Sequence, residues 1–217
     1  MTAGLTAADF TGALRAVLRP GMTVALGDGV GALRCTDDGA SVGAALSAAA
    51  GEVGSVRLVL GWLPAPIDGL DADAFADVVA LMPGWGVRDV LRGPTARFLP
   101  TRLAAIPALL ADVLRPDVLL TRLVSRDGLL RFGTEVSWQR AVIDNGTRTL
   151  AVIDTSSPAA DAEPPLDPPG TRSSARGFRT TPYAEFSFDE PIANSSQFSL
   201  PSRTAPAASR RATVVAS

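Results

Sequence analysis

A glycine-rich stretch near the N-terminus, VALGDGVGALRCTDDGASVGAAL (24–46), holds the residues best suited to chemistry. A glycine turn between a strand and a helix lets backbone N–H groups approach a ligand oxygen, and the helix N-terminus favours negative charge. The turn here is GDGVG (27–31), followed by Arg34. It departs from the dinucleotide-binding fingerprint, because Ala32 stands where the third glycine belongs. A tight structural turn and an acyl or phosphate pocket both remain open.

A second informative stretch is VSRDGLLRFGTEVSWQ (124–139). An apolar strand ends, Asp127 and Gly128 form a turn, and Gly133 leads into a helix that we expect to begin near Glu135. Taken alone, this pattern is typical of a β-turn with Asp and Gly in their usual roles, followed by a capped helix.

The residue types that are absent narrow the chemistry. The 217-residue chain has no histidine, and all twenty of its basic residues are arginine. Schiff-base lysines, Walker P-loops, Ser-His-Asp triads and histidine metal sites are therefore excluded. The single Cys35 excludes an intramolecular disulfide and a thiolate zinc cluster, and we interpret it as a small apolar filler. Carboxylates, hydroxyls, arginines and backbone dipoles remain.

Other polar and aromatic residues receive structural interpretations. The acidic stretches DD (37–38) and DAD (71–73) suit solvated helix starts better than a metal site. Trp62, Trp85 and Trp138 suit core or interface anchors. The arginines are scattered and the net charge is −2, so we predict no nucleic-acid partner.

The elements that must position these residues follow from apolar periodicity. Helices are predicted near 5–19, 41–50, 71–82, 106–114 (broken by Pro107) and 135–143. Strands are predicted near 22–26, 55–62, 95–103, 117–124 and 148–154. Because several strands are too apolar to have a wet face, we predict an α/β fold with an open, mainly parallel sheet and flanking helices.

Composition also predicts the domain organisation. Residues 1–155 form an α/β domain, 156–182 a Pro/Ser-rich linker, and 183–217 the start of a truncated second domain with a strand near 183–188. Apolar runs are too short to span a bilayer and the N-terminus lacks a signal-peptide pattern, so we expect a cytoplasmic protein with no membrane partner.

Four segments, read in order, resemble the first half of the acetyl-CoA hydrolase and CoA-transferase family. They are LRPGMTVALGDGVGALR (18–34), VRLVLGWLP (56–64), the long run from ARFLP to GTEVS (96–137) and RTLAVID (148–154). The long run carries an Asp, a Gly and a further Gly in the family's order, at Asp127, Gly128 and Gly133. The resemblance extends from residue 5 to about residue 155.

The resemblance implies a fold of two similar α/β domains with the active site between them. In this family a glutamate attacks an acyl-CoA thioester and forms an acyl-glutamyl anhydride, then a glutamyl-CoA thioester. A small carboxylate or water completes CoA transfer or hydrolysis. Such covalent catalysis by a carboxylate needs no histidine, lysine or metal. Coenzyme A thioester is then the substrate, and no permanently bound cofactor is expected.

The resemblance also assigns a pocket, in which glycine-loop amides stabilise oxyanions. Its candidate residues are Gly27, Asp28, Gly29, Gly31, Arg34, Asp127, Gly128 and Gly133. No residue is assigned as catalytic, because the family's glutamate belongs to the second half, and Glu135 and Glu190 do not match its position.

Three interpretations of function stay open. The chain is half of an acyl-CoA hydrolase or CoA-transferase that needs a glutamate-bearing second domain or subunit, with a homo-oligomer as the other partner arrangement. Alternatively, it is a catalytically silent truncated relic. The third interpretation is a non-enzymatic module that binds CoA esters.

Overall fold

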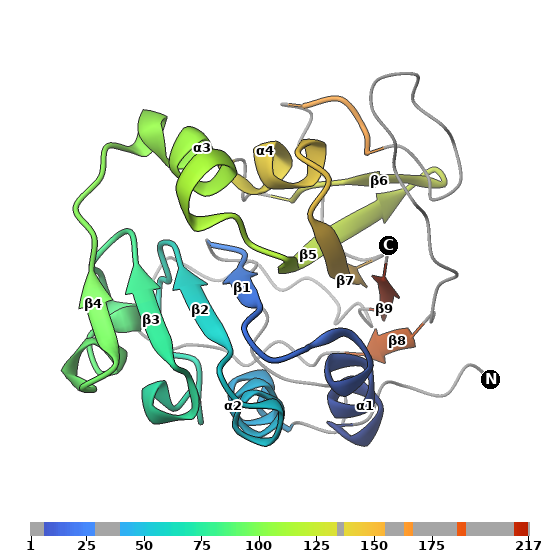
Figure 1. Cartoon of the computed structure of the whole chain (residues 1–217). Coiled ribbons are helices and arrows are strands. Elements are labelled where there is room, and N and C mark those ends of the chain that lie inside the picture. The colour runs from blue at the N-terminus through green and yellow to red at the C-terminus, as the bar shows by residue number, and fades with distance from the viewer. Residues whose placement is uncertain are drawn as a thin grey trace, which may run out of the picture.

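The computed structural model describes residues 7–28, 40–133, 137–154, 163–166, 186–189 and 211–216. Within these segments one sheet has nine strands, in the order β4-β3-β2-β1-β5-β7-β9-β8, with β6 paired to β5 (Figure 1). The strands are β1 Thr23–Leu26, β2 Arg57–Leu60, β3 Asp77–Ala80, β4 Ala96–Phe98, β5 Val118–Arg126, β6 Leu129–Arg131, β7 Arg148–Asp154, β8 Phe186–Asp189 and β9 Arg211–Ala216.

Along the sheet, the neighbouring strands β4, β3, β2, β1, β5 and β7 pair in parallel. Strand β6 pairs antiparallel with β5, β9 with β7, and β8 with β9. The α-helices are α1 Ala7–Val17, α2 Val42–Val53, α3 Ile106–Leu109 and α4 Gln139–Asp144. Single turns are η1 Ala72–Ala74, η2 Trp85–Val87, η3 Val90–Arg92 and η4 Leu103–Ala105, and α3 continues into a wider turn, η5 Leu110–Leu114. The predicted open, mainly parallel α/β sheet is confirmed.

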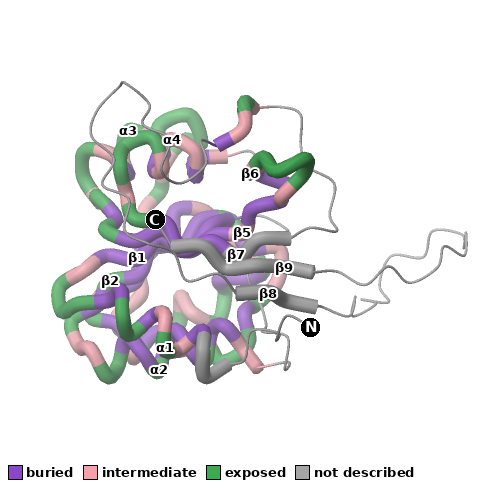
Figure 2. The backbone as a smooth tube through the Cα atoms, turned by 90° about the vertical axis from the view of Figure 1, so that its right-hand side faces the viewer, coloured by how far each residue is buried: buried purple, intermediate pink, exposed green. Residues whose placement is uncertain are grey.

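Helices cover both faces of the parallel strands, so alternate strand residues enter two different cores. Leu26, Leu58 and Leu120 pack in the core that includes residues of α1 and α2. Ala25 and Val59 point the other way, into the core that includes residues of α3 and α4. Figures 1 and 2 show α1 and α2 on one side of the sheet and α3 and α4 on the other. Burial on both faces explains the uninterrupted apolar runs of these strands.

Local signals fix the ends of α2. Ser41 precedes its first turn, and the Ser41 Oγ accepts a hydrogen bond from the Ala44 N–H, which satisfies one of the unpaired donors of the first turn. Gly54 ends the helix at φ +75°, a conformation that favours glycine.

The helix predicted at 71–82 is wrong. Asp71 caps only the single turn η1, where its carboxylate accepts from the Asp73 N–H at 3.0 Å. Residues Val78 and Val79 then lie in β3, which pairs in parallel with β2. Two adjacent β-branched residues suit a buried strand better than a helix, and sheet pairing decides between them.

Two further helix predictions need correction. Pro107 does not break the helix near 106–114 but lies in the first turn of α3, where a missing N–H costs nothing. The helix expected from Glu135 begins at Gln139 instead, and Glu135 itself lies outside the described residues.

The C-terminal strands join the same sheet. Residues of β9 pair with β7, and β8 pairs with β9. Of the predicted linker at 156–182, the structure describes residues 163–166, where Leu166 forms an antiparallel bridge to Leu130 of β6. The predicted division into domains and linker stays a prediction. Among the helices of the described residues, none combines the length and the apolar character that crossing a bilayer requires.

Candidate functional site

The order of the strands reverses at the carboxyl end of β1. From β1 the chain builds β2, β3 and β4 on one side, and then returns to place β5 and β7 on the other. In open parallel sheets, ligands bind outside the carboxyl ends of the strands where the order reverses. Gly27 and Asp28 follow β1 directly and therefore lie at this point. The Gly27 N–H donates to the Leu120 carbonyl of β5 at 2.8 Å, which ties the turn to the neighbouring strand.

Two glycines allow the backbone to pack closely here. A Cβ on Gly27 would lie 2.6 Å from Thr121 Oγ1, and a Cβ on Gly61 would lie 2.7 Å from the Asp28 Cβ and 2.8 Å from Trp138 Nε1. All three distances are shorter than van der Waals contact allows, so neither position has room for a side chain.

The Asp28 carboxylate points into the protein. The residue is 5% exposed, and the Trp138 indole N–H donates to its Oδ2 at 2.9 Å. The Trp62 N–H and the Ser137 hydroxyl donate to the same oxygen in longer bonds of 3.4 Å. Asp28 thus joins the end of β1 to the loop after β2 and to the start of α4.

Burial raises the pKa of the Asp28 carboxyl above its ordinary value of 3.8. Hydrogen bonds to the carboxylate lower the pKa and partly offset this effect; their donors are on Trp62, Trp138, Ser137 and Gln139. Burial is the larger effect, because removing a carboxylate from water disfavours its charged form.

Gln139 completes the cluster and leaves one polar atom unsatisfied. Its side chain is 1% exposed, and its Nε2 donates to the Asp28 backbone carbonyl at 3.2 Å. Its Oε1 is buried and has no hydrogen-bond partner in the described part of the chain. An unpaired buried acceptor costs about 1–3 kcal/mol. We call the cluster of Gly27, Asp28, Gly61, Trp138 and Gln139 the switch-point crevice.

The remaining residues predicted for the pocket do not all lie beside Gly27 and Asp28. Asp127 and Gly128 form the two-residue turn between β5 and β6, with φ +53° and +75°. They are exposed and lie beyond Arg126, about 20 Å of strand from Leu120. Gly133 is buried just after β6. Gly29, Gly31, Arg34, Cys35 and Glu190 lie outside the described residues.

Sequence reasoning missed Gly61 and Gln139 and gave Trp138 only an anchoring role. A glycine directly after an apolar strand is the one signal that points to Gly61. The contributions of Trp138 and Gln139 depend on β5 lying beside β1, which no local pattern indicates.

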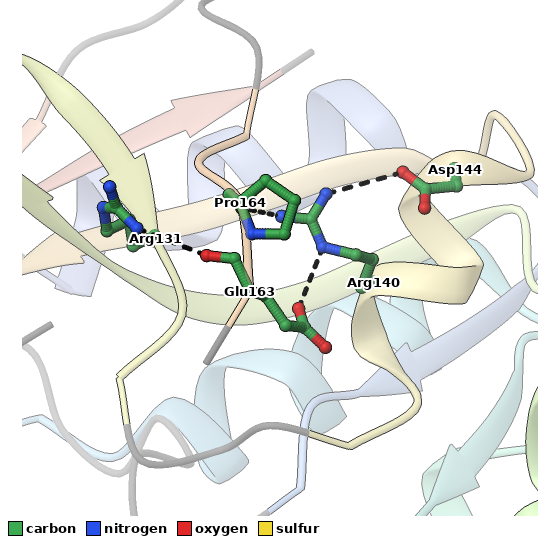
Figure 3. Close-up of polar contacts among 5 residues, drawn as sticks. All are labelled: Arg131, Arg140, Asp144, Glu163 and Pro164. Atoms are coloured by element: carbon green, nitrogen blue, oxygen red, sulfur yellow. Dashed lines mark hydrogen bonds and ion pairs between the residues drawn. The ribbon is translucent and has the colours of Figure 1, made fainter. Parts of the chain in front are cut away.

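Arg140, which follows Gln139 on α4, forms a polar clamp with Glu163 and Arg131. Arg140 Nε pairs with Glu163 Oε2 at 2.8 Å, and the same guanidinium donates to the Pro164 carbonyl (Figure 3). Arg131 of β6 donates to the Glu163 carbonyl at 3.2 Å. The clamp holds residues 163–166 against α4 and β6.

Two tryptophans are exposed near the crevice. Trp62, whose N–H contacts Asp28, is 40% exposed, and Trp85 is 75% exposed. They follow the carboxyl ends of β2 and β3, and the Arg88 guanidinium lies 5.8 Å from the Trp85 ring centroid. Of the three tryptophans that the sequence predicts as core or interface anchors, Trp138 lies in the core, whereas Trp62 and Trp85 are exposed.

The chemistry available in the crevice is hydrogen bonding around a buried carboxyl. The described residues hold no group of three His, Cys, Asp or Glu side chains that could bind a metal ion. Two of the cluster's polar groups, the Asp28 carboxyl and the Gln139 amide oxygen, are hydrogen-bond acceptors, and the Gln139 oxygen is the one without a donor among the described residues.

Solved structures with a similar fold include RipA from Yersinia pestis, with a TM-score of 0.51 and 16% identity over 65% of this chain and 35% of that chain. Its M31G mutant gives a TM-score of 0.54 at 16% identity, covering 65% of this chain and 34% of that chain. A malonate decarboxylase alpha subunit from Acinetobacter baumannii reaches only 0.42, at 16% identity over 67% of this chain and 28% of that one, and has no bearing on the fold. No protein-family model and no characterised protein sequence matches the chain.

The likeness to RipA shows a CoA-transferase-like fold. At this level of identity it shows the fold alone. The chain spans about a third of the length of RipA, 35%.

Proposed function

We propose that the chain binds an acyl-CoA thioester at the switch-point crevice, as the first half of an acyl-CoA hydrolase or CoA-transferase. The observation that carries the proposal is the CoA-transferase-like fold with a closely packed Gly27-Asp28 turn at its point of strand reversal. The CoA of the thioester passes to a small carboxylate, or water hydrolyses the thioester. The nucleophilic glutamate is supplied by a second half, because this chain offers no residue matched to that role.

Residue chemistry supports this division of roles. The chain has no histidine and no lysine, and carboxylate catalysis on a thioester needs neither. The buried Asp28 carboxyl is engaged by Trp138 and faces into the protein, so it serves the shape of the crevice rather than nucleophilic attack.

The exposed tryptophans favour a partner surface at the same end of the sheet. Trp62 and Trp85 follow the strand ends that lead to the crevice, and large exposed aromatic side chains are enriched at protein interfaces. A glutamate-bearing second half, or a second copy of this chain, would cover them.

The test is titration calorimetry of the full chain with acetyl-CoA, and with ATP as a control that lacks the thioester arm. We expect acetyl-CoA to bind in the micromolar range and ATP to bind at least tenfold more weakly. Equal affinities, or no acetyl-CoA binding, would contradict the proposal.

A thioester-cleavage assay separates the enzyme half from a binding module. The chain alone should leave acetyl-CoA intact, and a glutamate-bearing second half should bring turnover. Binding without turnover in the presence of such a partner would instead support the CoA-ester-binding module.

A further inference from the structure

The Gln139 amide has one orientation in the structure. Its Nε2 lies 3.2 Å from the Asp28 backbone carbonyl, which can only accept a hydrogen bond. The NH₂ end must therefore face Asp28, and Oε1 is the end left without a partner. Rotating the amide by 180° would bring two acceptor oxygens together, so this assignment follows from the neighbours.

The other polar side chains of the switch-point crevice already form hydrogen bonds with one another. The Trp138 indole N–H is engaged by Asp28 Oδ2 at 2.9 Å, and the Ser137 hydroxyl donates to the same oxygen at 3.4 Å. Gln139 Oε1 is the one buried side-chain polar atom of the described residues without a partner. Native proteins rarely leave such an atom unpaired, and a ligand donor is one of the groups that can satisfy it.

The chemistry of the crevice selects the kind of donor. An amide oxygen gains nothing from the unprotonated oxygens of a carboxylate or phosphate, which cannot donate. The adjacent Asp28 carboxyl adds repulsion against an anion whenever it is ionised. A neutral N–H group meets both conditions.

We infer that Gln139 Oε1 accepts a hydrogen bond from a neutral amide N–H of the ligand, which in an acyl-CoA belongs to the pantetheine arm. This inference rests on the proposed function and makes Gln139 a specificity-determining residue. It assigns this side of the crevice to the arm of the thioester and not to the acceptor carboxylate. Because the amide is 1% exposed, the crevice must open before the ligand enters, and association is slower than diffusion allows.

The test compares the affinity of the full chain for S-acetylpantetheine with that of Gln139→Met, which keeps the length of the side chain and removes both the Oε1 acceptor and the Nε2 donor to Asp28. We expect Gln139→Met to bind about five- to tenfold more weakly, as the loss of one hydrogen bond predicts. Val142→Ala is the matched control, because Val142 is buried on the same helix and has no polar side-chain atom. It should retain the affinity of the unmodified chain, measured on protein whose circular dichroism confirms folding.

Each outcome has one meaning. If Gln139→Met and the unmodified chain bind S-acetylpantetheine equally, or if Val142→Ala weakens binding as much as Gln139→Met, the inference is overturned. In both cases acetyl-CoA binding by the unmodified chain leaves the proposed function standing. If the unmodified chain binds neither acetyl-CoA nor S-acetylpantetheine, the proposed function fails and the inference fails with it.

Discussion

Two aspartates that each neighbour a glycine have opposite roles in this molecule. Asp28, next to Gly27, is 5% exposed, and its carboxylate accepts the Trp138 indole N–H. Asp127, next to Gly128, is exposed at the tip of the β5–β6 hairpin, where both residues have positive φ. The two pairs have the same composition, and the resemblance assigned both to one pocket.

The difference comes from where each pair lies in the sheet. Asp28 follows the strand at which the strand order reverses, so segments far apart in sequence meet around it. Asp127 joins two strands that are adjacent in sequence and needs only a conformation that turns the chain. Asp and Gly suit that conformation by themselves. Sheet topology, rather than residue type, separates a buried cluster from an exposed turn.

The largest contrast should appear when each carboxylate is removed. Asp28→Ala leaves the Trp138 indole N–H buried without an acceptor and should lower the free energy of unfolding by about 2–3 kcal/mol. Asp127→Ala should cost about 0.5 kcal/mol, because only a turn preference is lost. Urea unfolding measures both. Equal losses would mean that the buried cluster contributes no more than the exposed turn.

A smaller difference in stability should separate substitutions at Gly61, which packs against Asp28, and at Gly128, which follows Asp127 in the chain. Gly61→Ala forces the new Cβ against Asp28 and Trp138 and should cost about 2 kcal/mol. Gly128→Ala meets no atom within 4 Å, so only its φ of +75° opposes the substitution, at about 1 kcal/mol. Thermal unfolding gives the order of the two losses. A larger loss at Gly128 would contradict close packing in the crevice.

The pH dependence of stability should sharpen the contrast further. The folded pKa of Asp28 is raised, so its contribution to stability is fully present below 3.8 and declines as the pH rises through the folded pKa. In Asp28→Asn this decline should disappear. Asp77→Asn is the opposite control, because Arg97 lowers the pKa of Asp77 and its contribution is lost as the pH falls. Unfolding curves from pH 3 to 7 that change in the same direction for both variants would disprove the assignment.

The smallest expected effect concerns residues 163–166, which the clamp holds beside the hairpin strand β6. Glu163→Gln weakens the pairing with Arg140, and exchange of the Leu166 amide, which donates to Leu130, should accelerate severalfold. Asp144→Asn is the control, because Asp144 is 61% exposed on its side chain and lies 3.9 Å from Arg140. An unchanged Leu166 exchange rate in Glu163→Gln would show that the backbone contacts alone hold this segment.

The sequence predicts the elements better than their neighbours. Buried strands such as β1 and β5 are recognisable because their apolar runs have no polar face. The apolar run at 78–80 is too short for periodicity to separate strand from helix, and only pairing with β2 identifies β3. No local sequence pattern indicates the order of the strands, and this order places β5 beside β1.

The candidate site shows the same limit. Gly27 and Asp28 are predictable, because glycine and a polar residue directly after an apolar strand indicate a ligand turn. Their partners Trp138 and Gln139 follow Asp28 by 110 and 111 residues. For Asp127 and Gly128 the simple turn interpretation describes the geometry, and their distance along β5 is visible only once the strand length is known.

The position of β1 has a consequence for biosynthesis. One side of β1 pairs with β2, which the ribosome makes soon after it, while the other side waits for β5. At typical synthesis rates, the interval between the synthesis of β1 and that of β5 is about 5–20 s. During this interval β1 is an unpaired sheet edge whose side chains are buried in the folded protein. Open edges recruit other strands. A chaperone that shields nascent chains should therefore raise the yield of this protein most when translation between β2 and β5 is slow.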